Sequence, residues 1–383
     1  MKPKSLAVLL LIFVCPVQAA VDNAKFSAEY AKGLTAYQNK DYATALMLWF
    51  PLAEKDDAQA QFMLGNMYLQ QEGDRNNTIK ALQWYERAAK QNHLAAQSTL
   101  GRLYLNGQQV KQDFNQANKW LTAAARQKEP DSQYKLGKIY QDGLGVPKNA
   151  SKAAYWFTQA GELGHSGAQT ALALMHLIGE GRAVDQDKAI ELFQQAANQG
   201  NASAQFNLGI IYRDGLGSIT KDLASATQWF QQAASQHHAD AENVLGDFYK
   251  TGTFVTQDYK QALGWYEKAA QQNHIAALHS LGTMYVNGYG TPKNYKLGVE
   301  NFTRAAEAGH GLAQMDLGVA YFTGKGVSQD SVIAYAWFHL AAQQGVENAQ
   351  KNKTTAYNRL LPEDRRRALD MAATFNKKFT RMK

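Results

Sequence analysis

The chain has 383 residues, of which 45% are hydrophobic and 19% are charged, a composition typical of folded protein rather than of a disordered chain. Its single cysteine excludes a disulfide framework and a cysteine-rich zinc module. The formal net charge of +7 is uneven: residues 1–19 contribute +2, residues 20–350 contribute −2 and residues 351–383 contribute +7. Because most of the chain is close to neutral, we expect no nucleic-acid partner.

Residues 1–19 have the pattern of a secretory signal. Two lysines precede an apolar run from Leu6 to Val14, and small residues ending at Ala19 provide a cleavage site. The run is too short for a permanent membrane-spanning helix, and an uncleaved anchor is the alternative. Cys15 follows a valine instead of the small residue that lipidation signals require, so we expect cleavage after Ala19. The sequence therefore predicts export, to the periplasm of a Gram-negative bacterium or beyond it.

The rest of the chain repeats with a period of 36 residues, with one step of 37. Leu-Gly pairs recur at this interval, with Ala173 in place of the glycine once, and a tyrosine follows three residues later in every copy except that one, which has His176. Glycine inside a helix costs about 1 kcal/mol relative to alanine, so its recurrence predicts a close approach between helices. The glycines are Gly65, Gly101, Gly137, Gly209, Gly246, Gly282 and Gly318.

A second series of residues keeps the same interval and marks the start of another helix. Each member is Asp or Asn, the preferred residue types for a helix N-cap. We therefore predict two helices per repeat: helix A with the glycine and tyrosine, a glycine-rich loop, and helix B with aromatic residues and a pair of small residues. Six tryptophans at one position of helix B are predicted to pack between helices. The predicted caps are Asp41, Asn77, Asp113, Asn149, Asp185, Asp222, Asp258, Asn294 and Asp330.

This pattern resembles the Sel1-like repeat family, relatives of the tetratricopeptide repeats with a longer loop between the helices. The resemblance implies an all-α, right-handed solenoid of helix-turn-helix repeats. We expect a tetratricopeptide-like first repeat over residues 20–56, eight Sel1-like repeats over 57–348 and basic capping helices over 349–383. The family includes adaptors of envelope assemblies, exopolysaccharide export factors and virulence proteins that bind host proteins. The resemblance therefore implies an exported, non-catalytic interaction scaffold.

The residues that could carry chemistry fit structural roles. Five histidines recur once per repeat, one repeat width apart, and cannot converge on one metal ion; we interpret them as donors near the C-terminus of helix B. The pair His237-His238 is the alternative as a surface metal site. The glycine-rich loops lack the endings of phosphate and calcium loops, and no catalytic motif is present. We predict no catalytic residue, metal or cofactor; no residue set argues for the enzymatic alternative, a cell-wall or β-lactam hydrolase. The five histidines are His93, His165, His238, His274 and His310.

In tetratricopeptide-like arrays helix A lines the concave face, so the resemblance implies a groove there. We expect this groove to be basic near Arg102 and Lys138, apolar in its middle and polar afterwards, and to bind a partner protein or an extended peptide, such as an envelope component or a host protein. A solvated face without a ligand is the alternative. The candidate residues lie one after or three before the helix-A glycine: Phe62, Asn66, Ser98, Arg102, Tyr134, Lys138, Thr170, Leu174, Phe206, Ile210, Asn243, Asp247, His279, Thr283, Met315 and Val319.

Residues 349–383 break the period. Pro362 and the acids after it predict a helix start, and an apolar stripe at helical spacing predicts a helix that caps the array. The predicted stripe is Leu361, Ala368, Leu369, Ala372, Phe375 and Phe379. The alternative is a basic helix that docks on anionic lipid, lipopolysaccharide or an acidic partner through Arg365, Arg366, Arg367, Lys377 and Lys378.

Overall fold

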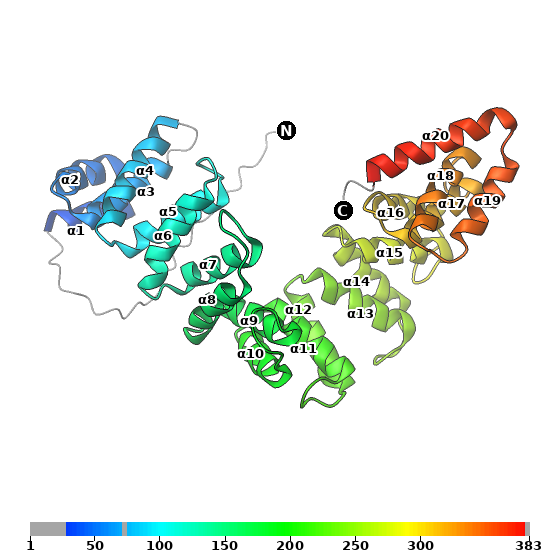
Figure 1. The fold of residues 1–383 in the computed structure, drawn as a ribbon, viewed down its shortest axis with the longest axis horizontal. Coiled ribbons are helices and arrows are strands. Elements are labelled where there is room, and N and C mark those ends of the chain that lie inside the picture. Colours follow the sequence, from blue (N-terminus) through cyan, green and yellow to red (C-terminus); the bar gives the residue numbers. More distant parts are fainter. Residues whose placement is uncertain (1–27, 71–74, 380–383) are drawn as a thin grey trace. The chain divides into compact units, whose positions relative to one another are not determined.

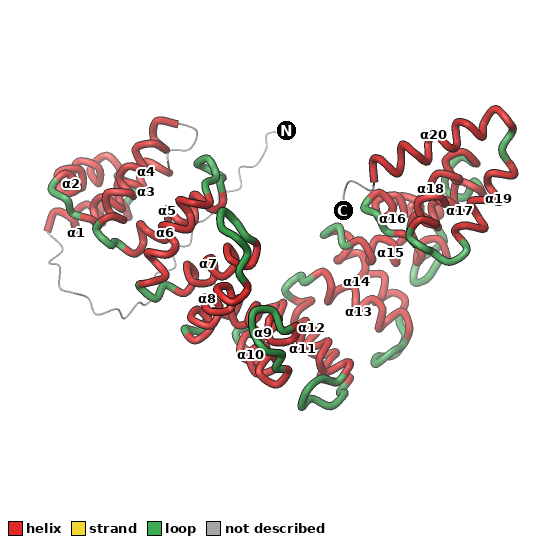
Figure 2. Tube along the Cα trace, viewed as in Figure 1, coloured by secondary structure: helices red, strands yellow, loops and turns green. Residues whose placement is uncertain are grey.

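The computed structural model describes residues 28–70 and 75–379, so the predicted signal over residues 1–19 lies outside the described part. The regular elements of this part are twenty α-helices, with one isolated β-bridge between Leu216 and Ile219 (Figures 1 and 2). Within each unit, most consecutive helices pack on one another, both the two helices of a pair and the second helix of a pair with the first helix of the next. The chain divides into two compact units, each of which is described by itself.

Of the described residues, the first unit comprises 28–70, 75–132 and 144–146. Its first helix pair corresponds to the predicted tetratricopeptide-like repeat: Gly33 lies against the buried ring of Trp49, where a Cβ atom would overlap the indole. The helices are α1 (Ala28–Gln38), α2 (Tyr42–Glu54), α3 (Ala58–Gln70), α4 (Arg75–Lys90), α5 (Leu94–Asn106) and α6 (Phe114–Arg126).

Of the described residues, the second unit comprises 133–143 and 147–379 and begins within α7 (Pro130–Asp142). It continues with α8 (Ala150–Glu162), α9 (Ser166–Ile178), α10 (Gln186–Asn198), α11 (Ala202–Asp214), α12 (Leu223–Ser235), α13 (Ala239–Thr251), α14 (Tyr259–Gln271), α15 (Ile275–Asn287), α16 (Tyr295–Glu307), α17 (Gly311–Thr323), α18 (Ser331–Gln343), α19 (Ala349–Arg359) and α20 (Pro362–Phe379).

The recurring glycine is where helix A and helix B of a repeat touch. In α11, a Cβ atom on Gly209 would lie 2.6 Å from the Phe230 ring of α12. The residue buried against the glycine is the one that follows the tryptophan position, whereas the sequence analysis had assigned the tryptophan itself to the packing between helices. Of the six tryptophans, Trp84, Trp120 and Trp337 are buried, whereas Trp156, Trp229 and Trp265 are half-buried. The residues that face the glycines are Tyr85, Leu121, Phe157, Phe230, Tyr266, Phe302 and Phe338.

The predicted caps of helix B are confirmed at eight positions, where an Asp or Asn side chain accepts a hydrogen bond from a backbone N–H of the first turn. Asn77 is the exception: α4 begins at Arg75, so this residue lies inside the helix. The confirmed caps are Asp41, Asp113, Asn149, Asp185, Asp222, Asp258, Asn294 and Asp330.

The same caps also close the loop between the two helices. The backbone N–H of Asn294, for example, donates to the carbonyl of Tyr285 at 2.8 Å. The loop before it contains Gly290, which has φ +71° and lies against the backbone of Tyr259 in the preceding repeat, where a side chain would overlap. This position therefore requires glycine both for its backbone conformation and for the close approach.

In most repeats a pair of glutamines links the start of helix A to the ends of the helices B beside it, and the glutamine in helix A is buried. A glutamine near the start of helix A donates to a carbonyl eight residues earlier, as Gln205 does to Ala197 at 3.2 Å, and accepts from the glutamine that follows helix B, as from Gln236 at 2.8 Å. In α13 the position holds Glu242, which is fully buried. Its Oε2 accepts from Gln272 at 2.8 Å, whereas Oε1 has no hydrogen bond in the described part of the chain and lies 3.7 Å from His237 Nδ1. A carboxylate cannot donate to a carbonyl, so this repeat lacks the bond that Gln61, Gln97, Gln169, Gln205 and Gln314 make in theirs.

The last two helices pack against α18. The rings of Phe375 and Phe379 in α20 lie 4.7 Å and 5.3 Å from the Trp337 ring, and Ala368 and Ala372 are buried. α20 begins at Pro362 as predicted. The predicted apolar stripe is wrong at two positions, because Leu361 and Leu369 are exposed and lie off the packed side.

Candidate interaction surface

The outward side of the first helix of each repeat forms what we call the A-helix face. It comprises the residues one and five positions after the helix-A glycine, or after Ala173 in α9. The first row is Asn66, Arg102, Lys138, Leu174, Ile210, Asp247, Thr283 and Val319. The second row is Gln70, Asn106, Asp142, Ile178, Asp214, Thr251, Asn287 and Thr323, all of them exposed. The sequence prediction included only the first row.

Two members of the first row are held by helix B of their own repeat. The hydroxyl of Tyr85 donates to Asn66 Oδ1 at 2.8 Å, and that of Tyr266 donates to Asp247 Oδ1 at 2.6 Å. Burial raises the pKa of both tyrosines, and the hydrogen bond to Asp247 raises the pKa of Tyr266 further. Both hydroxyls therefore stay protonated and fix the side chain that they contact.

The predicted basic part of the surface is weaker than expected. Lys138 lies 3.5 Å from Asp142, four residues later on the same helix, and donates to Gln141 at 2.8 Å. Its charge is therefore largely matched within α7. Arg102 is exposed and belongs to the first unit.

The other predicted row, three residues before the glycine, contributes mainly to contacts between repeats. The Phe206 ring of α11 stacks at 4.8 Å on His238, the residue before α13, and Tyr134 stacks at 4.5 Å on His165. Phe62 and His279 make the same kind of contact with the next repeat. Thr170 is buried and donates to a backbone carbonyl, so its prediction as a groove residue is wrong. The rest of the row, Ser98, Asn243 and Met315, is partly buried, and Met315 packs against the terminal helices.

These contacts place the first helices of successive repeats next to each other. The Asn201 side chain before α11 lies 3.4 Å from Ser166 Oγ in α9, and His238 before α13 stacks on α11. In the same way, His279 Nε2 of α15 lies 2.8 Å from Asp316 Oδ2 of α17. Within the second unit, the A-helix face is therefore a row of adjacent helices.

Comparison with known proteins agrees with this architecture. The Sel1 repeat profile matches eight consecutive segments: residues 58–93, 94–129, 130–165, 166–201, 202–238, 239–274, 275–310 and 311–346. The chain belongs to the Sel1 repeat family. The expected family and the all-α solenoid fold class are both confirmed.

Two solved structures show the same relationship. A Sel1 repeat protein from Oxalobacter formigenes is 32% identical, with a TM-score of 0.64, and the match covers 80% of this chain and 89% of that one. A protective antigen of uropathogenic Escherichia coli with an SLR fold is 30% identical, with a TM-score of 0.58, and the match covers 92% of this chain and 84% of that one. No match was found among the curated proteins. Sel1 repeat proteins are generally protein-interaction scaffolds.

Four of the five recurring histidines have a different role from the predicted one, and the fifth, His238, precedes α13 without a side-chain cap hydrogen bond. They precede helix A, and Nδ1 of His93 accepts from the Ala96 N–H at 3.2 Å, so the ring is an N-cap acceptor and not a donor at a helix C-terminus. His165, His274 and His310 cap in the same way, and Asn201 does so with its amide oxygen. The sequence prediction assigned these residues to the wrong helix end because one short turn separates the two helices.

Burial favours the neutral form of two of these capping rings. It is the main cause that lowers the pKa of His93 and of His310, and the neighbouring His279 lowers the pKa of His310 further. A protonated ring would carry a hydrogen on Nδ1 and could not accept the backbone N–H. The caps therefore depend on the neutral form.

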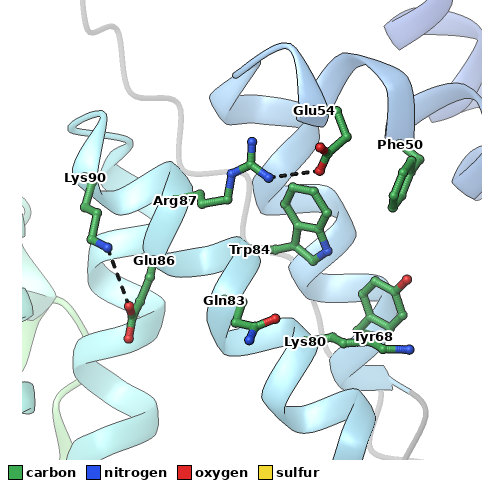
Figure 3. Close-up of a pocket in the computed structure, with 9 residues that line it drawn as sticks. All are labelled: Phe50, Glu54, Tyr68, Lys80, Gln83, Trp84, Glu86, Arg87 and Lys90. Carbon is green, nitrogen blue, oxygen red and sulfur yellow. Dashed lines mark hydrogen bonds and ion pairs between the residues drawn. The ribbon is translucent and has the colours of Figure 1, made fainter.

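A hollow of the first unit lies between α2, α3 and α4, with a volume of about 660 Å³ (Figure 3). Its aromatic and charged side chains are already engaged with one another. Arg87 lies 4.6 Å from the Trp84 ring centroid and forms an ion pair with Glu54 at 2.9 Å, and Phe50 meets the same indole edge-on. Because these groups already bind one another, fewer of them are available to a ligand than on the A-helix face.

Part of the positive charge near the C-terminus is exposed to solvent. Arg365 lies over the Tyr357 ring and Arg367 pairs with Asp364, while Arg366, Lys377 and Lys378 are exposed. No helix in the described residues is both long and apolar enough to span a membrane. The described side chains also contain no cluster of three or more His, Cys, Asp or Glu that could hold a metal ion.

Proposed function

We propose that this chain is an exported, non-catalytic scaffold that binds a partner protein through the A-helix face. The observation that carries the proposal is a contrast within each first helix. The buried positions repeat one small set of residues, whereas the exposed or half-buried positions of the first row change in size and charge from Arg102 to Leu174 to Asp247. Packing alone does not require such variation at exposed sites, and a specific partner does.

Export rests on the predicted signal over residues 1–19 and on the kind of protein to which the chain is similar. The E. coli relative of 30% identity is a protective antigen, which is a property of proteins that reach the host immune system. A periplasmic or secreted position fits both observations. The partner is then an envelope component or a host protein.

The test compares two faces of the same molecule in a pull-down from the bacterial envelope. One variant replaces Leu174 and Val319 of the A-helix face by serine. The matched control replaces by serine the exposed Tyr155 of α8 and the exposed Leu163 at its C-terminal end. We expect the first variant alone to lose the captured partner. Loss in the control alone, or capture that neither variant changes, would contradict the proposal.

A second candidate function, binding to an anionic surface, has one observation in its favour: the exposed cations Arg366, Lys377 and Lys378 on α20. The apolar side of this helix is packed on Trp337, so the attraction would be electrostatic and sensitive to salt. Flotation with phosphatidylglycerol vesicles at low and high salt tests it, with Lys377→Glu/Lys378→Glu as the variant. Binding that this variant does not reduce would contradict it.

A further inference from the structure

The repeat over residues 166–201 differs from the others on the A-helix face. At the second-row position the other seven Sel1 repeats have Gln, Asn, Asp or Thr, whereas α9 has Ile178, which is 68% exposed. Leu174 lies one turn earlier on the same side of the helix and is 41% exposed. Ile210, which is half-buried and packs partly on the core around Phe230, occupies the corresponding first-row position of the adjacent α11. Together these three residues form an apolar strip across two adjacent helices, with polar second-row residues on both sides.

The next helix along presents a carboxylate. Three acids lie on the A-helix face of the second unit. Asp142 is paired with Lys138, and Asp214 is paired with Arg213 at 2.7 Å. Asp247 is held by hydrogen bonds from Tyr266 and Asn243, but no ion pair links it to a cation within residues 75–379. It is a fixed negative charge whose neutralising partner is not supplied by the described part of the chain.

The spacing of these features suits one peptide conformation. Axes of packed helices lie about 8–10 Å apart. A polyproline II segment advances about 9.3 Å in each three-residue turn, and every third side chain lies on the same side. Three adjacent helices would then meet side chains i, i+3 and i+6 of one segment.

We propose that α9, α11 and α13 bind an extended segment of a partner protein that has two apolar side chains three residues apart and a Lys or Arg three residues further on. The apolar pair covers Leu174, Ile178 and Ile210, and the cation reaches Asp247. The inference rests on the proposed function, since it names the partner chemistry of the same face.

The test uses two fluorescein-labelled peptides with the sequence Leu-Ser-Pro-Leu-Ser-Pro-Lys and its reverse, because the chain direction is open. Binding to the purified full chain is measured by fluorescence anisotropy. We expect one peptide to bind with a micromolar Kd. Ile178→Thr, which introduces the residue present at 251 and 323, weakens this binding at least tenfold. The matched control Val319→Thr, on the A-helix face of α17, leaves it unchanged.

The charge assignment has its own control. Asp247→Asn introduces the side chain found at Asn66, which also accepts a tyrosine hydroxyl, so the fold is kept. We expect it to weaken the lysine peptide about fivefold and to leave a norleucine-ended peptide unaffected. Equal effects on both peptides would overturn the role of Asp247.

Failure of both peptides to bind better than a serine-only peptide would overturn the proposal, as would equal effects of Ile178→Thr and Val319→Thr. Binding to anionic vesicles that Ile178→Thr abolishes would assign the strip to a membrane surface and overturn it too. The proposed function is judged separately, because its pull-down does not use these peptides. Partner capture that depends on the A-helix face without peptide binding would reject only the present inference.

Discussion

The two sides of each first helix follow opposite rules. The inner side is nearly the same in every repeat, as with Gly209 against Phe230 and Gly318 against Phe338. The outer side changes with each repeat, from a lysine that forms an ion pair within its helix to an exposed isoleucine. It then changes to an aspartate that accepts hydrogen bonds but has no ion-pair partner in the described part of the chain. The comparison teaches that stability and specificity are separate on one helix, so that each can be changed without the other.

The largest expected effect comes from filling the inner side. Gly209→Leu drives a side chain into the Phe230 ring and should lower the free energy of unfolding by about 3 kcal/mol. Gly264, inside α14, has no atom within 4 Å of a Cβ position, so Gly264→Leu should raise the stability by up to about 1 kcal/mol. Urea unfolding followed by circular dichroism measures both. A similar loss in the two variants would show that the close helix contact is not the cause.

The glutamine pairs give the next largest effect, and the chain offers a reciprocal experiment. Glu242→Gln supplies the missing N–H donor and should stabilise the region around α13 by about 1–2 kcal/mol. Gln205→Glu removes that donor in the preceding repeat and should destabilise it by a similar amount. Hydrogen exchange of the backbone amides in α11 and α13 resolves the two changes. Effects of the same sign would contradict the assigned role of the bond.

Acid should weaken the capping histidines by about 1 kcal/mol each. The folded-state pKa of His93 and of His310 is lowered, so the unfolded chain takes up protons first, and stability is lost as the pH falls below about 6.5. The variant His93→Asn/His310→Asn installs the amide cap that Asn201 already provides. Its stability should vary less with pH between 7.5 and 5 in thermal unfolding. An identical pH dependence in the variant would place the titrating groups elsewhere.

The smallest effects on stability belong to the outer side. Arg102→Glu changes an exposed residue and should alter the free energy of unfolding by less than about 0.5 kcal/mol. Lys138→Glu also removes the partner of Asp142, so its loss should be slightly larger, at about 0.5 kcal/mol. Thermal denaturation of both variants checks this order. A loss of more than about 1 kcal/mol in Arg102→Glu would show that this side supports the fold.

The sequence predicted the features that one residue type determines by itself. Asp and Asn at helix starts, and glycine where two helices approach, follow from backbone chemistry and were placed correctly except at Asn77. The features that depend on a partner elsewhere in the chain were missed. The capping role of His93, the pairing of Gln205 with Gln236 and the burial of Thr170 each require knowing which helix lies opposite. Ile178 could have been found by comparing its position across the repeats.

The central claim is that the outer side of the first helices contacts the partner. A photo-crosslinking residue placed singly at Leu174, Ile178 and Val319, and at Tyr155 in α8 and Leu163 at its C-terminal end, tests it in cells that produce the chain. The account predicts covalent adducts with one partner protein from at least one of the first three positions and none from the last two. Adducts formed only at Tyr155 or Leu163 would contradict it.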